Sequence, residues 1–477
     1  MNSIESAEPV FGIFKELNAV PRPSHNEGCV ADWLCAFAAK HGLEHDRDSN
    51  NCVVIRKPAS PGYEDREPVV ILNHMDMVCV AEPGVAFNPL EDGIDSYVED
   101  GWIKARGTSL GADNGLGLSM ALAVLADDSI SHPALEVLTT TNEEDGMSGA
   151  CGLSPDFIRG RKVLNLDSED YDTITVGAAG AYLQIHEIPF SASPAAPDRK
   201  YFRIGVTGGL GGHSGVDINK GRGNAIKLLF SFLADVSDDI DVSLSDVSGG
   251  SANASIASSA EAVVGVKPED EERFRRLADE FAVAVSAEYG STDADLCVVM
   301  AESARPSSVI DAAAASGLLC AIRAVPAGVT DPEGCGADET PVTSNNIGML
   351  AMSDGVITVS THTRSFFDSE MTALGESIRD AFNARTELVM SAPAWRESRD
   401  SEYIASVCST FEDVLGFSPR KVEMHFVLEA GYYVSKYPGI QIACIGPRIV
   451  CPHSTGERAE ISTVENIWKV VKAILAR

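Results

Sequence analysis

Histidine and carboxylate side chains follow several separate apolar stretches of this chain, where together they could hold a metal ion. They are His74, Asp76, Asp113, Glu143, Glu144 and Asp167. A single acid after a strand is usually a turn residue or a helix cap. Several carboxylates gathered in one place repel one another unless a cation neutralises them. One imidazole with several carboxylates suits a divalent ion, with zinc first and manganese or cobalt as alternatives.

Two pairs among these residues have spacings that suit hydrolysis at a metal. Glu143 and Glu144 are adjacent, so one can bind the ion while the other takes a proton from water. His74 and Asp76 are two residues apart and would share one face of an extended strand. Asp76 could therefore orient the imidazole of His74.

The elements that carry these residues alternate between strand-like and helix-like stretches. Short apolar strands are expected at 52–56, 69–73, 135–141 and 163–167, and an apolar helix at 114–126. This alternation predicts an α/β layered sheet, in which ligands bind beyond the carboxyl ends of the strands. A second region begins near residue 184, with strands near 202–206 and 356–361, helices near 223–234, 268–289 and 368–384, and a loop at 247–259. A third begins near residue 395 and reads helix, strand, helix.

The motifs around these residues resemble those of the zinc-dependent carboxypeptidase–aminoacylase–dipeptidase family. The metal-site motifs are HMDMV, GTSLGADNGLG, TTNEEDGMSGA and LNLDSED. Further matches are GGHSGVDINKGRGNA, SNNIG, THTRSFF, HFVLEAG and IGPRIVCPHSTGERAEI. The resemblance covers nearly the whole chain, from PRPSHNE at residue 21 onwards, and its motifs are long and ordered.

The resemblance implies two divalent metal ions, most simply Zn²⁺, with Mn²⁺ or Co²⁺ as alternatives. The implied ligands are His74 and Asp167 for the first ion, Glu144 and His453 for the second, and Asp113 as a bridge between them. Glu143 would be the general base for attack by a metal-bridging hydroxide, and Asp76 would orient His74. Because the ligands Asp167 and His453 lie far apart in the chain, a large insertion is expected between them.

That insertion sets the expected domain organisation. Residues 1–183 and 392–477 are expected to form one discontinuous catalytic domain, a mixed sheet flanked by helices. Residues 184–391 are expected to form an inserted α+β lid. A lid of this length could hold two subdomains. One of them could then occupy the position that a second subunit would take in a dimer.

The resemblance also implies substrate contacts from the lid and the third region. These residues are His213, Asn253, Arg364, His425 and Glu429. His213 would stabilise the tetrahedral oxyanion, and Arg364 would hold the substrate carboxylate. Three stretches depart from the family pattern: ASIASSAEA after Asn253, HFVLEAG in place of HAGLECG, and STGER in place of SPDE. None of these departures replaces an expected metal ligand. All three could alter the substrate pocket, so the sequence does not define which substrate side chains it accepts.

Composition excludes several classes of partner. The chain has 37 basic and 70 acidic residues and a formal net charge of −33, which repels nucleic acid and anionic lipid. The N-terminal stretch is acidic and has no apolar segment, so no signal peptide is expected, and no uncharged apolar run is long enough to cross a membrane. The 11 cysteines include no C-x-x-C pair. We therefore expect reduced thiols and a cytoplasmic location. The sequence leaves the choice between a monomer and a homodimer open.

The resemblance implies a metallo-dipeptidase that hydrolyses unblocked dipeptides, with Xaa-His peptides among the candidates. One alternative is an N-acyl amino acid amidohydrolase on the same metal scaffold. Another is a non-catalytic metal- or peptide-binding homologue, in which the residue that acts as general base would be expected to be replaced. The candidate base, Glu143, is present.

Overall fold

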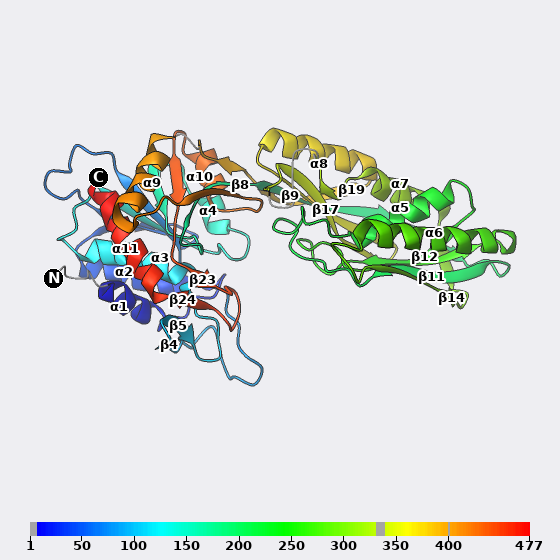
Figure 1. Cartoon of the computed structure of the whole chain (residues 1–477), viewed down its shortest axis with the longest axis horizontal. Coiled ribbons are helices and arrows are strands. Elements are labelled where there is room, and N and C mark those ends of the chain that lie inside the picture. The colour runs from blue at the N-terminus through cyan, green and yellow to red at the C-terminus, as the bar shows by residue number, and fades with distance from the viewer. Residues whose placement is uncertain (1–6, 331–338, 399–400) are drawn as a thin grey trace. The chain divides into compact units, whose positions relative to one another are not determined.

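The chain divides into two compact units, shown in a computed structural model (Figure 1). The structure describes residues 7–330, 339–398 and 401–477. The first unit is the described part of Met1–Gly177 together with Trp395–Glu423 and Glu429–Arg477. The second unit is Ala178–Ala394 together with Met424–Leu428. The short stretch Met424–Leu428 thus belongs to the second unit although its neighbours on both sides belong to the first, which the sequence did not predict.

The first unit is built on a nine-stranded mixed sheet. Its order is β1 (Glu44–Arg47), β2 (Val53–Lys57), β6 (Leu135–Thr140), β3 (Val69–His74), β7 (Lys162–Asn165), β22 (Gln441–Cys444), β8 (Thr173–Ala178) and β20 (Trp395–Arg396), with β21 (Arg420–Met424) beside β8. The four central strands β6, β3, β7 and β22 are parallel. The expected α/β fold class is confirmed, and the carboxyl ends of these strands meet at one edge.

Helices pack against this sheet and close its core. They are α1 (Glu8–Leu17), α2 (Gly28–Lys40), α3 (Ala112–Ala126), α4 (Ser148–Gly152), α9 (Glu402–Leu415), α10 (Ala430–Lys436) and α11 (Ile461–Ala476). Helix α3 contacts α1, α11 and β3, and it is buried from Leu116 to Leu125. This burial explains why its sequence is apolar all round rather than on one stripe. A small sheet completes the unit, in the order β23 (Ile449–Val450), β24 (Arg458–Glu460), β5 (Trp102–Ala105) and β4 (Ser96–Glu99).

The second unit is an antiparallel sheet with four long helices. The strand order is β14 (Cys297–Ser303), β11 (Lys200–Thr207), β13 (Ala260–Val266), β12 (Ser243–Gly249), β17 (Thr343–Ser353), β18 (Val356–Ser365), β9 (Gly180–Pro189) and β19 (Arg385–Ala392), with β16 (Gly328–Val329) beside β17. A separate pair joins β10 (Ala192–Pro194) to β15 (Ser308–Ile310). The helices are α5 (Ala225–Ser237), α6 (Glu271–Tyr289), α7 (Ala312–Ala324) and α8 (Asp368–Phe382), and a 3₁₀ turn η1 (Pro268–Asp270) precedes α6.

Two local expectations in this unit need correction. The loop expected at 247–259 begins later, because its first three residues complete β12, where Gly249 pairs with both β13 and β17. The helix expected from Pro268 begins as a 3₁₀ turn, since Pro268 has no N–H to donate and suits a first turn.

Two sequence expectations concern the chain as a whole. Within the described ranges, no helix is long and apolar enough to cross a membrane. The described cysteines are all free thiols. Residues 1–6, which begin the stretch where no signal peptide is expected, and Cys335 lie outside the described residues.

Candidate metal centre

The carboxyl ends of the parallel strands gather the histidine and carboxylate residues of the first unit. His74 ends β3, Glu143 and Glu144 follow β6, and Asp167 follows β7 by two residues. Asp113 lies in the first turn of α3. His453 comes from the turn between β23 and β24. Each candidate ligand is thus positioned by a different element whose apolar residues are buried in the core, so several elements together fix the positions of the ligands.

Asp113 lies between two histidines and offers one carboxylate oxygen to each. Its Oδ1 is 3.2 Å from His74 Nε2, and its Oδ2 is 3.3 Å from His453 Nε2. His74 Nε2 also lies 3.3 Å from Asp167 Oδ1, and His453 Nε2 lies 2.8 Å from Glu144 Oε2. The side chains therefore form two groups, one around each histidine, that share Asp113.

Asp76 is fully buried beneath this cluster. Its Oδ1 lies 3.4 Å from His74 Nδ1, and the same nitrogen is 3.2 Å from the Asp76 carbonyl oxygen. The carboxylate also accepts the backbone N–H of Glu143 at 3.1 Å and of Glu144 at 3.2 Å. Ser24 donates its hydroxyl to Asp76 Oδ2 at 2.8 Å. Asp76 thus fixes both the ring of His74 and the backbone of the two glutamates.

The electrostatics of the cluster show an excess of negative charge. Burial raises the pKa of Glu143 well above its usual value, and the nearby Asp167, Glu429 and Glu144 add to the rise. Burial likewise raises the pKa of Glu144 and Asp167. Hydrogen bonds to Asp113 and Glu144 raise the pKa of His453 to about 11. The surrounding carboxylates also raise the pKa of His74, so both histidines are drawn toward their cationic form.

The donor set fits a divalent cation. His74, Asp113 and Glu144 each offer one ligand atom, and these three atoms lie within 4.8 Å of one another. Glu144 Oε1 is buried and has no hydrogen-bond partner within the described part of the chain. A buried carboxylate oxygen without a donor is costly, and a cation would relieve that cost. Imidazole and carboxylate donors together are those that zinc and its divalent neighbours accept.

Four of the five substrate-contact candidates gather in the second unit. Arg364 on β18 is buried and donates from Nη2 to Ser214 Oγ at 3.3 Å, next to His213. His425 Nε2 lies 2.7 Å from Ser344 Oγ on β17. Asn253 lies near Asn346, whose side-chain amide is 3.5 Å from the Asn253 carbonyl oxygen. Burial lowers the pKa of Arg364 to about 10 and that of His425 to about 3. This cluster is therefore cationic at Arg364 and neutral at its histidines.

Glu429, the fifth candidate, lies in the first unit instead. Its Oε2 accepts the hydroxyls of Thr140 at 2.9 Å and Tyr433 at 3.1 Å, while Oε1 is buried without a partner within the described ranges. Burial raises its pKa to about 8. Glu429 is thus separated by unit from His425, although the two belong to one motif.

Sequence reasoning missed several residues that support the candidate ligands. Asn114 donates from Nδ2 to Asp167 Oδ1 and to the Leu166 carbonyl oxygen, the latter at 3.0 Å. Ser24 supports Asp76, as described above. In the second unit, His362 was not among the expected site residues, and it is buried on β18 two residues before Arg364. The adjacency of Asn114 to Asp113 was a usable signal, whereas Ser24 lies 52 residues from Asp76 and had none.

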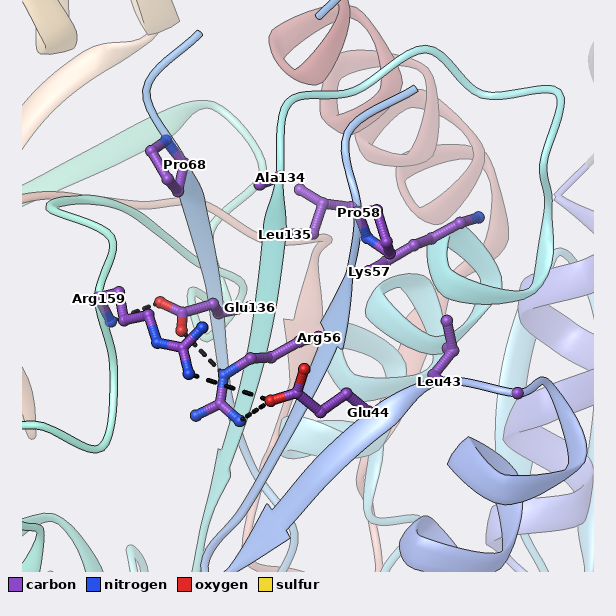
Figure 2. A pocket seen from close by; sticks show the side chains of 11 residues that line it. Leu43, Glu44, Arg56, Lys57, Pro58, Pro68, Ala134, Leu135, Glu136 and Arg159 are labelled. Carbon is purple, nitrogen blue, oxygen red and sulfur yellow. Dashed lines mark hydrogen bonds and ion pairs between the residues drawn. The ribbon is translucent and has the colours of Figure 1, made fainter. Parts of the chain in front are cut away.

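A cavity lies at the opposite, amino end of the parallel strands (Figure 2). It has a volume of about 410 Å³. Glu136 Oε1 accepts from Arg56 Nε at 3.2 Å, and Arg56 also pairs with Glu44 at 3.3 Å. Arg159 lies 4.0 Å from Glu44. The acids at this end are already neutralised by arginines, unlike those around Asp113.

Comparison with known proteins identifies the family of the chain. Residues 70–477 match the model of peptidase family M20/M25/M40. The cytosol non-specific dipeptidase of Escherichia coli (strain K12) is 31% identical over 473 residues, which cover 98% of this chain and 97% of that protein. The crystal structure of aminoacylhistidine dipeptidase from Vibrio alginolyticus superposes with a TM-score of 0.90 at 31% identity, covering 98% of this chain and 96% of that one. Aminopeptidase PepT from Bacillus cereus shares the fold, with a TM-score of 0.61 at 17% identity. The chain belongs to peptidase family M20/M25/M40.

Proposed function

We propose that the protein is a metal-dependent dipeptidase that hydrolyses unblocked dipeptides. The observation that carries the proposal is Asp113, which offers one oxygen to each of two histidine–carboxylate groups. This arrangement suits a bridge between two closely spaced ions. His74 and Asp167 would hold the first ion, and Glu144 and His453 the second.

The metal requirement follows from the chemistry of amide hydrolysis. Divalent ions bound at these ligands would polarise the scissile carbonyl and lower the pKa of water. Zinc is the first choice for a His and carboxylate ligand set, with manganese or cobalt as alternatives. Asp76 keeps His74 in one orientation through Nδ1, so that Nε2 faces the ligand cluster.

Glu143 is the proposed general base. Its backbone N–H is held by Asp76, and the raised pKa of its carboxyl lets it both accept a proton and return it. In hydrolysis it takes a proton from the attacking water and gives a proton to the leaving amine. Glu144, held by the same Asp76 carboxylate, is left to bind metal.

The second unit is proposed to act as the lid and to recognise the substrate. Arg364 is a buried cation in a cluster with His213, Asn253 and His425, and it would bind the free carboxylate of a dipeptide. His213, whose pKa is lowered by burial and by Arg364, would donate to the developing oxyanion as a neutral ring. Glu429 in the first unit offers a buried oxygen for a substrate donor.

The names of the relatives guide the choice of substrate. One is called a non-specific dipeptidase and the other an aminoacylhistidine dipeptidase. We propose that this chain accepts Xaa-His among other dipeptides, as a monomer or homodimer in the cytoplasm. The amidohydrolase alternative uses the same metals and differs in its substrate.

The test compares hydrolysis of Ala-His with that of an N-acetyl amino acid, before and after treatment with a chelator. We expect cleavage of Ala-His, its loss on chelation, and its recovery with Zn²⁺, Mn²⁺ or Co²⁺. Full activity of a demonstrably metal-free preparation would refute the metal mechanism. Preferential cleavage of the N-acetyl substrate would favour the amidohydrolase.

A further inference from the structure

Glu457 binds the backbone of the turn that carries Asp113. Its Oε2 accepts the N–H groups of Leu110 at 2.7 Å and Gly111 at 2.9 Å. Its Oε1 accepts those of Ala112 at 2.8 Å and Asp113 at 3.4 Å. The side chain is 4% exposed. One buried carboxylate therefore holds four consecutive amides at the start of α3.

Arg22 binds the same turn through its carbonyl groups. Its Nη2 donates to the Gly111 carbonyl oxygen at 2.6 Å, and its Nη1 donates to those of Met75 at 3.3 Å and Asp76 at 3.2 Å. The side chain is 1% exposed. Arg22 thus joins the turn before α3 to the stretch that follows His74.

The turn has little freedom to relax between these two groups. Gly111 has φ +65°, and a Cβ placed there would lie 2.5 Å from Arg22 Nη2 and 2.6 Å from Met77 Sδ. Burial raises the pKa of Glu457, but the amide hydrogen bonds oppose that rise. Because all four partners are N–H donors, none of them accepts a carboxyl proton. The ionised form also lies at the positive end of α3.

Glu457 is also close in sequence to a proposed metal ligand. It follows His453 by four residues, and its own N–H donates to the Ser454 carbonyl oxygen at 3.2 Å within the same turn. A single short turn therefore carries His453 and grips the backbone of Asp113. The stretch STGER, taken above as a departure that spares the ligands, thus reaches the amide of one of them.

We propose that Glu457 and Arg22 are positioning residues that set the spacing between Asp113 and the two histidines, an inference that rests on the proposed metal function. Asp113 can share two ions only if each oxygen stays near its own histidine. The Glu457 carboxylate fixes Asp113 relative to His453, and the Arg22 guanidinium fixes the turn relative to the end of β3. Neither side chain needs to contact an ion.

The decisive variant is Glu457→Gln. The glutamine amide group is a donor, so it would face two backbone N–H groups and lose their hydrogen bonds. We expect affinity for the divalent ions to fall about 10- to 100-fold, as for other residues that support ligands. Titration of metal-depleted protein with Zn²⁺ against a chromophoric chelator measures this. The visible absorption of the Co²⁺-loaded protein should also change, because it reports ligand geometry.

Glu136→Gln is the matched control. Glu136 is also 4% exposed, and its Oε2 accepts the backbone N–H groups of Arg159 at 2.7 Å and Gly160 at 2.8 Å, at the other end of the sheet (Figure 2). We expect this variant to lower the melting temperature but to leave metal affinity and the Co²⁺ spectrum unchanged. Arg22→Lys gives a milder test, because it keeps the charge but reaches fewer carbonyls, and it replaces Glu457→Gln if that variant does not fold.

The outcomes separate the two proposals. If Glu457→Gln and Arg22→Lys bind both ions with wild-type affinity and show the wild-type Co²⁺ spectrum, the positioning role is wrong and the metal site stands. An equal loss of metal affinity in Glu136→Gln would also overturn it, because the effect would then be general. If the wild-type protein binds no divalent ion, the proposed metal function itself fails.

Discussion

The parallel strands of the first unit have acids at both ends, and the two ends neutralise them differently. At the amino end, Glu136 and Glu44 face Arg56, and Arg159 lies nearby (Figure 2). At the carboxyl end, six acids and two histidines meet, and no lysine or arginine forms an ion pair with them among the pairs that the described residues make. The six acids are Asp76, Asp113, Glu143, Glu144, Asp167 and Glu429.

This difference distinguishes a structural cluster from a candidate site. A buried acid paired with arginine already has its counter-charge, so removing either partner costs stability. Acids without such partners raise one another's pKa and make a cation the favourable addition. Charge alone would not separate the two ends, because both are rich in acids. The two ends differ in the group that neutralises their acids, which is arginine at the amino end and, as we propose, a metal ion at the carboxyl end.

The largest expected effect is on turnover at the carboxyl end. Glu143→Gln should lower kcat for Ala-His by about 10²- to 10⁴-fold, because it removes the proposed general base. Both ions should remain bound, as measured by elemental analysis of the purified protein. Glu136→Gln should leave kcat unchanged. Loss of metal from Glu143→Gln would instead make Glu143 a ligand.

Glu144→Gln should act on metal binding rather than on proton transfer. Because Glu144 is a proposed direct ligand, the affinity for one of the two ions should fall by more than the roughly 100-fold seen for supporting residues. A Zn²⁺ titration should then resolve one tight and one weakened site. Retention of two tight sites would reverse the roles of the adjacent glutamates.

Arg364→Ala extends the comparison to the second unit, where a buried arginine lies among neutral histidines. A charged hydrogen bond is worth about 1.5–3 kcal/mol, so kcat/KM for Ala-His should fall roughly 10- to 150-fold. The variant should also discriminate less against dipeptide amides, which lack the carboxylate. An unchanged ratio of acid to amide hydrolysis would remove Arg364 from substrate binding.

The smallest effect on catalysis is expected at the amino end. Arg56→Met removes the guanidinium from Glu136 and leaves that buried carboxylate with its two amide donors, so unfolding free energy should fall by about 1–3 kcal/mol. Chemical denaturation measures the loss, and kcat should not change. Arg159→Met is the control, because its exposed pair should contribute less than about 1 kcal/mol.

The elements around the candidate site and three of the four long helices of the second unit could be predicted from the sequence, whereas several strands of the second unit could not. The expected strand at 69–73 is β3 (Val69–His74), and the expected helix at 114–126 is α3 (Ala112–Ala126), because apolar runs there end abruptly at polar residues. Strand β12 carries the polar sequence SLSDVSG and a register shift, so its apolar residues do not alternate along the strand. Strand β14 lies at a sheet edge and is half exposed.

The same limit applies within the site. His74, Asp113 and Glu144 could be chosen because their types and motifs suit a metal. Arg22 and Glu457 could not, because their partners are backbone groups. Every residue type carries a backbone carbonyl, and all but proline carry a backbone N–H, so the sequence does not show which of them a side chain binds. Glu457 also lies 344 residues from the Asp113 amide that it binds. Such contacts become visible only once the chain is folded.

The short stretch Met424–Leu428 has a consequence for dividing the protein into fragments. A recombinant piece spanning Ala178–Ala394 would lack this stretch, and with it the His425 ring that meets Ser344. The His425 carbonyl oxygen also lies close to Gly215, only 2.4 Å from where a Cβ on that residue would be, so its removal would leave space in the loop beside His213. A fragment limited to Ala178–Ala394 would therefore be incomplete, and a faithful fragment of the second unit would need residues 424–428 joined by a linker.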